Sequence, residues 1–163
     1  MAKVKVVYGS TTGATETAAQ TIAAGLDAEL INVAGADAGA FDADVVVVGC
    51  STWGLGELQD DWMDKINLLD KVDLSGKKAA VFGTGDQQGF GDTFVDAIGI
   101  LADKLASRGA TIIGNTSTAG YSHSGSAADK GGEFCGLAID DTNEAELTDG
   151  RIAAWVEQLK SEI

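Results

Sequence analysis

Residues 45–48 are four consecutive valines, flanked by Asp44 and by Gly49-Cys50, and they constrain the fold more than any other stretch of the sequence. An apolar run without alternating polar residues is typical of a strand that is buried on both faces. Such strands occur in the middle of parallel sheets that carry helices on both sides. The run therefore predicts an α/β fold with this strand near the centre of the sheet.

Strands and helices alternate along the rest of the chain. Short β-branched runs predict strands, and apolar residues at helical spacing predict amphipathic helices. The expected strands are 4–8, 29–33, 45–48, 77–82 and 111–113, and the expected helices are 12–26, 58–69, 92–108 and 149–159. This order predicts one domain, built on a parallel sheet with helices on both faces.

The segment of residues 115–134 interrupts the alternation. It is rich in Gly, Ser, Ala and Asp and is far longer than the usual connection between a helix and a strand. We expect a surface excursion that splits or extends the fifth strand, with residues 136–139 following it. His123 is the only histidine and has no evident nucleophile or ligand set nearby, so we expect it to be a surface residue.

The charge balance narrows the choice of partner. The chain has 11 Lys and Arg against 25 Asp and Glu, which gives a formal net charge of −14. Nucleic acids and anionic membrane surfaces attract basic proteins, so we expect neither as a partner. A basic protein surface is the partner that this charge favours.

The two cysteines and the apolar runs indicate the compartment. Cys50 and Cys135 form neither a disulfide framework nor a cluster of zinc ligands; we expect Cys50 to be buried and Cys135 to be partly exposed. The N-terminal apolar run is too short for a signal peptide, and no later run could span a bilayer. These features predict a soluble protein of a reducing, cytoplasmic compartment.

Ligands of open parallel sheets bind where the strands end, and the first strand ends in an unusual loop. Its sequence is Ser10-Thr11-Thr12-Gly13-Ala14-Thr15. Hydroxyls, a glycine and a helix N-terminus suit an anion such as phosphate, although the lysine of a Walker A loop is missing. A threonine that simply caps the helix explains the segment equally well, and the sequence alone does not separate these alternatives.

Two further strand ends carry aromatic residues. The second has the sequence Ser51-Thr52-Trp53-Gly54-Leu55-Gly56-Glu57, and the third has Thr84-Gly85-Asp86-Gln87-Gln88-Gly89-Phe90-Gly91-Asp92. Trp53 either offers a flat face to a planar ligand or covers the edge of the core, and Phe90 provides a second such face. Together the three ends suit a phosphorylated flat heterocycle, and flavin mononucleotide (FMN) fits best.

These loops resemble those of flavodoxins. The resemblance rests on four motifs in family order and spacing: residues 10–15, Cys50-Ser51-Thr52-Trp53-Gly54, Glu57-Leu58-Gln59-Asp60-Asp61-Trp62 and Gly83-Thr84-Gly85-Asp86-Gln87-Gln88-Gly89-Phe90. It extends over residues 3–163, and the 115–134 segment is similar to the loop that distinguishes long-chain flavodoxins. The implied fold is α/β: a three-layer, doubly wound, five-stranded parallel sheet with strand order 2-1-3-4-5 and an insertion in strand five, in a single domain of residues 1–163.

The resemblance implies a low-potential one-electron carrier, and not an enzyme, that holds FMN noncovalently and cycles between semiquinone and hydroquinone. The phosphate would be held by Ser10, Thr11, Thr12, Gly13, Ala14 and Thr15. Trp53 would flank one face of the ring and Phe90, where the family usually has Tyr, the other face. Thr84, Gly85 and Asp86 would present backbone groups to the polar edge of the ring, and the set is completed by Ser51, Thr52 and Gly54.

The resemblance also implies the kind of partner. Long-chain flavodoxins are associated with ferredoxin–NADP reductase, photosystem I and nitrogenase, and the sequence does not choose among them. We expect the protein to be a monomer that binds redox proteins with a basic surface.

Acidic residues beside the loops would tune the flavin. A negative charge about 10 Å from the ring costs an anionic flavin roughly 1–2 kcal/mol at an effective dielectric near 20. The acids on or beside the loops are Glu57, Asp60, Asp61, Asp64, Asp86 and Asp92.

Two other functions are compatible with an α/β sheet of this kind. An FMN-dependent NAD(P)H or quinone oxidoreductase would need a nicotinamide site, and no basic pocket for a dinucleotide is evident in the sequence. A receiver domain would need an acidic pair after the first strand and an Asp after the third, where this chain has Gly9-Ser10 and Cys50-Ser51. The oxidoreductase remains the alternative.

Overall fold

The computed structural model describes residues 3–9, 13–53, 57–89 and 91–163. For Trp53 and Glu57 it describes only the backbone. The strands are β1 (Val4–Gly9), β2 (Glu29–Asn32), β3 (Val45–Trp53), β4 (Glu57–Leu58), β5 (Lys78–Thr84), β6 (Thr111–Ile112), β7 (Thr116–Ser117), β8 (Glu133–Phe134) and β9 (Leu137–Ile139). The helices are α1 (Ala14–Leu26), α2 (Asp60–Lys65), α3 (Asp96–Ser107) and α4 (Ala145–Glu162). Short 3₁₀ helices are η1 (Val33–Gly35), η2 (Ala38–Phe41) and η3 (Ile66–Lys71).

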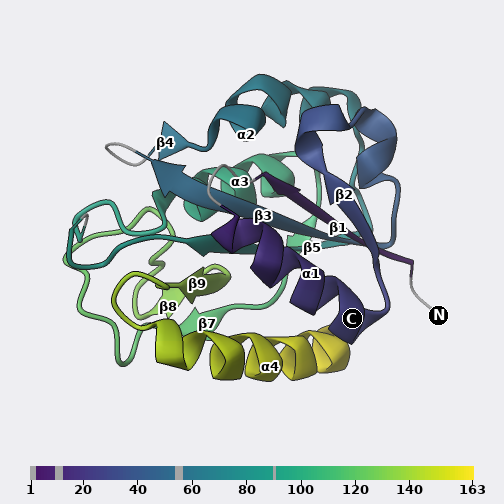
Figure 1. Cartoon of the computed structure of the whole chain (residues 1–163). Coiled ribbons are helices and arrows are strands. Elements are labelled where there is room, and N and C mark those ends of the chain that lie inside the picture. Colours follow the sequence, from purple (N-terminus) through teal and green to yellow (C-terminus); the bar gives the residue numbers. More distant parts are fainter. Residues whose placement is uncertain (1–2, 10–12, 54–56, 90) are drawn as a thin grey trace.

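The main sheet has the strand order β2-β1-β3-β5-β6, and its neighbours along this path pair in parallel (Figure 1). β9 also pairs in parallel with β5, at Phe82–Thr84, beyond the stretch that β6 pairs. β6 and β9 are therefore two parts of one edge strand, separated by the excursion that contains the antiparallel pair β7–β8. The expected order 2-1-3-4-5 and the insertion in strand five are both confirmed.

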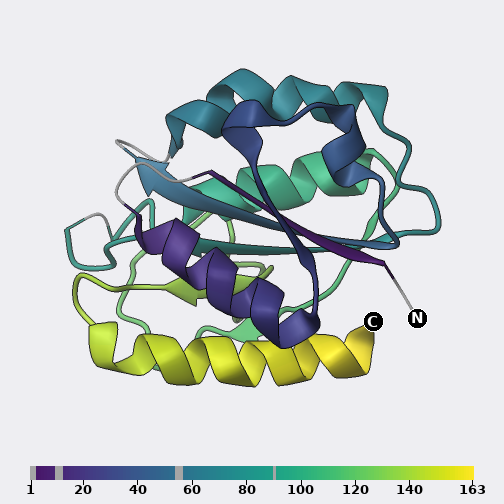
Figure 2. The same cartoon turned by 45° about the vertical axis from the view of Figure 1, so that its right-hand side comes forward.

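The four valines of β3 are buried on both faces, as expected. Each is 2% exposed or less. Val45 and Val47 pack in the cluster formed with α1 and α4, whereas Val46 and Val48 pack in the cluster formed with α2 and α3. Figure 2 shows these helix pairs on opposite faces of the sheet. The alternation of side chains along a strand thus supplies two cores from one run of valine.

All four helices differ from the expected boundaries. α1 begins at Ala14 rather than at residue 12, because Gly13 occupies the N-cap position. In place of a helix over 58–69, a short α2 continues as the 3₁₀ helix η3, a common form of tightening at a helix end. α3 begins at Asp96 rather than Asp92, because Val95 has a left-handed backbone (φ 49°) and the Phe94 N–H donates to Gly125 O of the excursion. α4 begins at Ala145 rather than Asp149; its first turn is exposed, so no apolar pattern marks it.

The excursion packs on the domain through its own aromatic side chains. Tyr121, His123 and Phe134 contact one another and Phe94, with ring centroids 5.0–6.4 Å apart. The prediction of a surface His123 is wrong: its side chain is 8% exposed, and Nε2 lies 3.1 Å from Asp129 Oδ2. An apolar neighbour distant in sequence, Phe94, provides this burial, so the local sequence gave no signal.

Both thiols are buried. The expectation for Cys50 is confirmed, but Cys135, predicted to be partly exposed, is only 5% exposed because it lies between β8 and β9 against α3. Burial raises the pKa of Cys50 to about 12 and that of Cys135 to about 11.

We expect neither thiol to react with iodoacetamide in the folded protein at about pH 8, since the thiolate is the reactive form. Unfolding in urea should expose both cysteines of the chain, which mass spectrometry would count as two added carbamidomethyl groups. Rapid labelling of either thiol in the folded protein would contradict the burial described above.

Candidate functional site

Three strand ends meet at one edge of the sheet. Gly9 of β1 is opposite Cys50 of β3, and Ser51 of β3 is opposite Thr84 of β5. The chain order reverses between β1 and β3, which makes this edge the switch point where ligands of such sheets bind. The strand ends from which the three predicted loops start therefore lie side by side.

The first loop leads into α1 with a glycine at the N-cap. Gly13 has a left-handed backbone (φ 93°), and a Cβ added to it would meet nothing within 4 Å. The N-cap position itself is Gly13, and the threonines that could cap the helix from the loop lie outside the described residues. Helix N-termini attract anions through their N–H groups and dipole, and the open space at Gly13 suits a phosphate there. Ser10, Thr11 and Thr12 lie outside the described residues.

Thr15 connects the first loop to the third. Its side chain is 1% exposed, and its Oγ1 lies 3.0 Å from Thr84 Oγ1, a hydrogen bond between residues on α1 and β5. Ala14 precedes it in the first turn of the helix. A buried contact thus joins the segment predicted to hold the phosphate to the segment predicted to line the polar edge of the ring.

The second loop is supported from both sides. Thr52 pairs with Leu58 in the antiparallel β3–β4 ladder, and its Oγ1 accepts the Ala97 N–H of α3 at 3.0 Å. Ser51 is 8% exposed. The side chain of Trp53 and all of Gly54 lie outside the described residues.

Gln59 and Trp62 pack closely against this edge, a role that was not predicted for either residue. A Cβ added to Gly9 would lie 2.4 Å from Gln59 Oε1 and 2.7 Å from Trp62 Cδ1, so only glycine fits. Trp62 donates from Nε1 to Gly49 O at 2.7 Å. These contacts fix α2 against the end of β1 and the middle of β3.

The third loop folds around the carboxylate of Asp86. Its Oδ1 accepts the N–H groups of Gln88 (3.1 Å) and Gly89 (2.8 Å) and the side-chain amide of Asn143 (2.7 Å). These donors, Gly89 first, hold the pKa of Asp86 below its usual value against the effect of desolvation. Asp86 therefore keeps its negative charge near the site.

Gly85 and Phe90 are the other two residues of the third loop that were predicted to belong to the site. The Gly85 N–H donates to Ile139 O of β9 at 2.9 Å, so it is engaged within the sheet. Phe90 lies outside the described residues.

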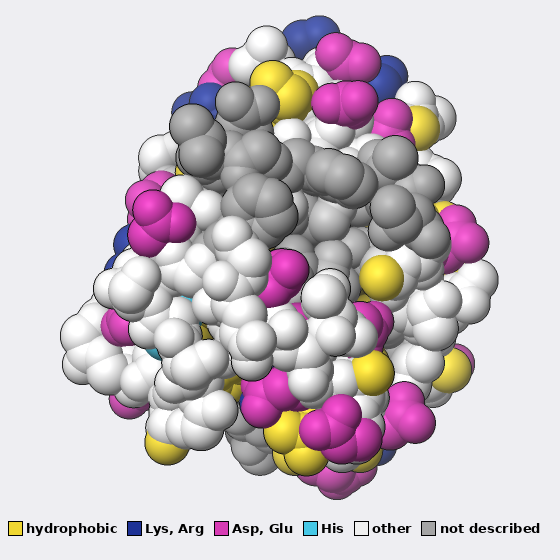
Figure 3. Space-filling model, turned by 60° about the vertical axis from the view of Figure 1, so that its left-hand side comes forward, with side chains coloured by type: hydrophobic (Ala, Val, Ile, Leu, Met, Phe, Trp, Pro, Cys, Tyr) yellow, Lys and Arg dark blue, Asp and Glu magenta, His cyan; other side chains and the backbone are white. Residues whose placement is uncertain are grey.

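Figure 3 looks onto this end of the molecule, where acidic side chains are spread over the face and Lys and Arg lie toward its margins. Asp60, Asp64 and Asp92 are exposed. In the described parts of the chain, no group of three or more His, Cys, Asp or Glu could hold a metal ion. Nor is any helix in those parts long and apolar enough to cross a membrane.

The fold and the site define an open, doubly wound α/β protein with a binding edge at its switch point. The family model described as "Flavodoxin" matches residues 6–155. A flavodoxin of Picosynechococcus sp. is 48% identical over 165 residues, covering 98% of this chain and 97% of its own, and one of Trichodesmium erythraeum is 49% identical over 168 residues, covering 99% and 98%. Fusobacterium nucleatum flavodoxin bound to flavin mononucleotide superposes with a TM-score of 0.95 at 28% identity, over 100% of this chain and 99% of that one. The chain belongs to the flavodoxin family.

Proposed function

We propose that this flavodoxin is a one-electron carrier that holds FMN noncovalently at the carboxyl ends of β1, β3 and β5. The observation that carries the proposal is the convergence of the ends of β1, β3 and β5 at the switch point, where β1 leads toward the N-terminus of α1. Family membership and the FMN bound by Fusobacterium nucleatum flavodoxin support it.

The proposed binding residues form three groups, according to the part of FMN that each group would contact. Thr15 and Gly13, with Ala14, would hold the phosphate at the start of α1, together with Ser10, Thr11 and Thr12. Ser51, Thr52 and Gly54 would border the cofactor from β3, with Trp53 and Phe90 on the two faces of its ring. Thr84, Gly85 and Asp86 would line the polar edge.

When bound, FMN supplies the one-electron chemistry, and the chain supplies the environment. Backbone N–H groups at the start of α1 would bind the phosphate, the Thr15–Thr84 contact joins α1 to β5, and Asp86, whose pKa is held low, would supply a negative charge at the polar edge. This chain's own contribution is therefore one of orientation and charge.

Added salt should raise the lower of the two one-electron potentials of the FMN-loaded protein. The surrounding carboxylates disfavour a second negative charge on the flavin, and salt screens them, so we expect a rise on the order of tens of millivolts between low and near-molar ionic strength. Spectroelectrochemistry measures this, with free FMN as the control for the effect of salt on the flavin itself. A potential no more salt-dependent than that of free FMN would contradict the role of the acids.

A carrier and an oxidoreductase are separated by one experiment. As a carrier, the FMN-loaded protein should not be reduced at a significant rate by NADPH alone, but it should be reduced when a ferredoxin–NADP reductase is added. Rapid reduction by NADPH without the reductase would favour the enzyme.

We further propose that the chain is of the long-chain type, that residues 1–163 form a single FMN-binding domain, and that the protein is a cytoplasmic monomer. Its partners would be redox proteins with a basic surface, such as ferredoxin–NADP reductase, photosystem I or nitrogenase. The excursion between β6 and β9 supports the first of these statements, and the net charge of −14 supports the partner class.

A further inference from the structure

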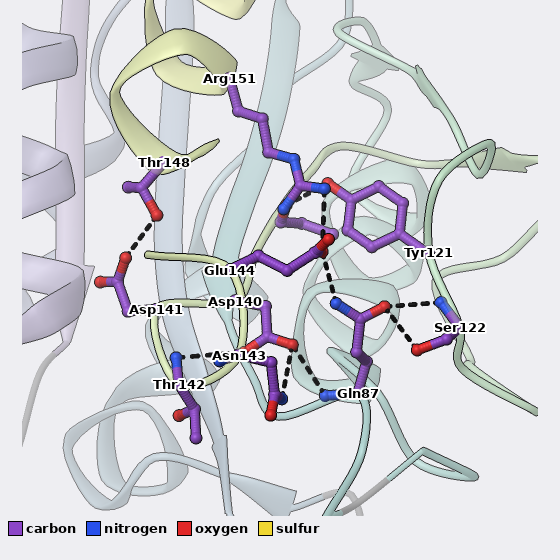
Figure 4. Close-up of polar contacts among 11 residues, drawn as sticks. Gln87, Tyr121, Ser122, Asp140, Asp141, Thr142, Asn143, Glu144, Thr148 and Arg151 are labelled. Carbon is purple, nitrogen blue, oxygen red and sulfur yellow. Dashed lines mark hydrogen bonds and ion pairs between the residues drawn. The ribbon is translucent and has the colours of Figure 1, made fainter. Parts of the chain in front are cut away.

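Gln87 is buried directly after Asp86 and uses its polar groups to join separate parts of the chain. It is 3% exposed. Its backbone N–H donates to Asp140 Oδ2 at 3.1 Å, and its Nε2 donates to Glu144 Oε1 at 2.6 Å. Its Oε1 accepts the N–H and the hydroxyl of Ser122, at 2.6 and 3.2 Å (Figure 4). The third loop, the end of β9, the start of α4 and the excursion thus meet at one residue.

The partners of Gln87 are themselves held in place. Glu144 Oε1 also accepts from Arg151 at 3.0 Å, and the guanidinium of Arg151 lies 4.3 Å from the centre of the Tyr121 ring. The Tyr121 hydroxyl donates to Ala138 O of β9 at 2.6 Å. Glu144, a partner of Gln87, is therefore linked through Arg151 and Tyr121 to β9.

Asn143 extends the same restraint to Asp86. Its side-chain amide donates both to Asp140 Oδ2 (2.9 Å) and to Asp86 Oδ1 (2.7 Å). Asp86 and Gln87 are consequently fixed through the carboxylate of Asp140, which is 0% exposed. A hollow of about 540 Å³, lined by Gln87, Gln88 and Gly89 of the loop and by Ser122 of the excursion, adjoins these contacts.

We propose that Gln87 is a positioning residue for the cofactor: it clamps loop 84–89 against α4 and the excursion, and this clamp sets the affinity for FMN. The inference rests on the proposed function, since it takes the loop to be part of the FMN site. Gln87 itself need not touch the flavin.

Gln87→Glu is the most direct test because it keeps the shape of the side chain and replaces the amide, whose Nε2 is a hydrogen-bond donor, with a carboxylate. At about pH 8 the new carboxylate would face the Glu144 oxygen that Nε2 now contacts, and its pKa would be raised by burial and by like charge. The loop can avoid this repulsion in the apoprotein by opening, but FMN binding would need it closed. The charged and titratable groups that face position 87 are Asp86, Asp92, Tyr121, Asp140, Glu144 and Arg151. Tyr121 stays protonated throughout, since burial raises its pKa to about 12.

The measurement is the FMN dissociation constant of the apoproteins at about pH 8 and about pH 5, expressed as a ratio to the unsubstituted protein at the same pH. We expect Gln87→Glu to weaken binding about tenfold or more at the higher pH, equivalent to one lost buried hydrogen bond to a charged group. At the lower pH the protonated side chain can donate to Glu144 again, so the ratio should fall to about threefold or less.

Two variants control the test. Gln88→Glu adds the same charge at the next, exposed position and should change the dissociation constant less than about threefold at either pH. Gln87→Met removes the side-chain hydrogen bonds without adding charge, so its loss of FMN affinity should be equal at both pH values. This variant also tests the clamp if Gln87→Glu does not fold. Equal binding by Gln87→Met and the unsubstituted protein, or a loss in Gln87→Glu that ignores pH, would overturn the clamp. If the unsubstituted protein bound no FMN at all, the proposed function would fail first, and this inference with it.

Discussion

Replacing Trp155 with alanine is expected to lower the free energy of unfolding by about 3–5 kcal/mol, the range for large aromatic residues in a core. Trp155 is 1% exposed and packs edge-on against Phe82 of β5, with ring centroids 6.0 Å apart. Its Nε1 donates to Gly114 O at 2.8 Å, where the chain leaves β6 for the excursion. One side chain thus anchors α4, a central strand and the entry to the excursion.

Urea unfolding of the FMN-free protein is the appropriate measurement, because bound cofactor would add its own stabilisation. Trp155→Phe is the matched variant: it keeps most of the ring but leaves the Gly114 carbonyl without its donor, which we expect to cost about 1–3 kcal/mol. A loss below about 1 kcal/mol in Trp155→Ala would show that α4 is not held to the sheet as described.

The second large effect is expected from Asp140→Ala. The fully buried carboxylate accepts the backbone N–H groups of Gln87, Thr142 and Asn143 and the side-chain amide of Asn143, at 2.9–3.1 Å. Each buried donor left unpartnered costs about 1–3 kcal/mol, so we expect the apoprotein to lose at least about 3 kcal/mol of unfolding free energy.

Asp141 provides the control for Asp140. It is the next residue and carries the same charge, but it is exposed, and its oxygen accepts only from the Thr148 hydroxyl among the contacts described. Asp141→Ala should change the stability by about 1 kcal/mol or less in the same urea experiment. Equal effects of the two substitutions would mean that net charge, and not the buried hydrogen bonds, is responsible.

Much of the fold could be predicted because hydrophobic patterns report burial directly. The valines of β3 indicated a strand between two cores, and each of the five predicted strands is present near its expected position. One of the boundaries that failed, the start of α3, depends on a contact between distant residues. α3 starts late because Phe94 binds Gly125 of the excursion, and no local pattern in 92–95 contains that information.

The sequence indicated which loops form the candidate site, but it did not indicate the buried residues that hold those loops in place. Glycines, hydroxyls and aromatic residues at strand ends indicated where a ligand would bind, and the ends of β1, β3 and β5 do lie side by side. Gln87, Asp140 and Asn143 were missed because polar residues of these kinds are ordinary in loops; only the fold buries them and brings positions 87 and 140 together. His123 was misplaced for the same reason.

The most direct measurement is a titration of FMN with the apoprotein, followed by flavin fluorescence. An FMN site with aromatic residues on the ring faces should quench the emission, with an endpoint at one FMN per chain and a flavin spectrum that stays with the protein on gel filtration. Unchanged fluorescence in excess protein, and a colourless protein after gel filtration, would contradict the assignment of this chain as an FMN-carrying flavodoxin.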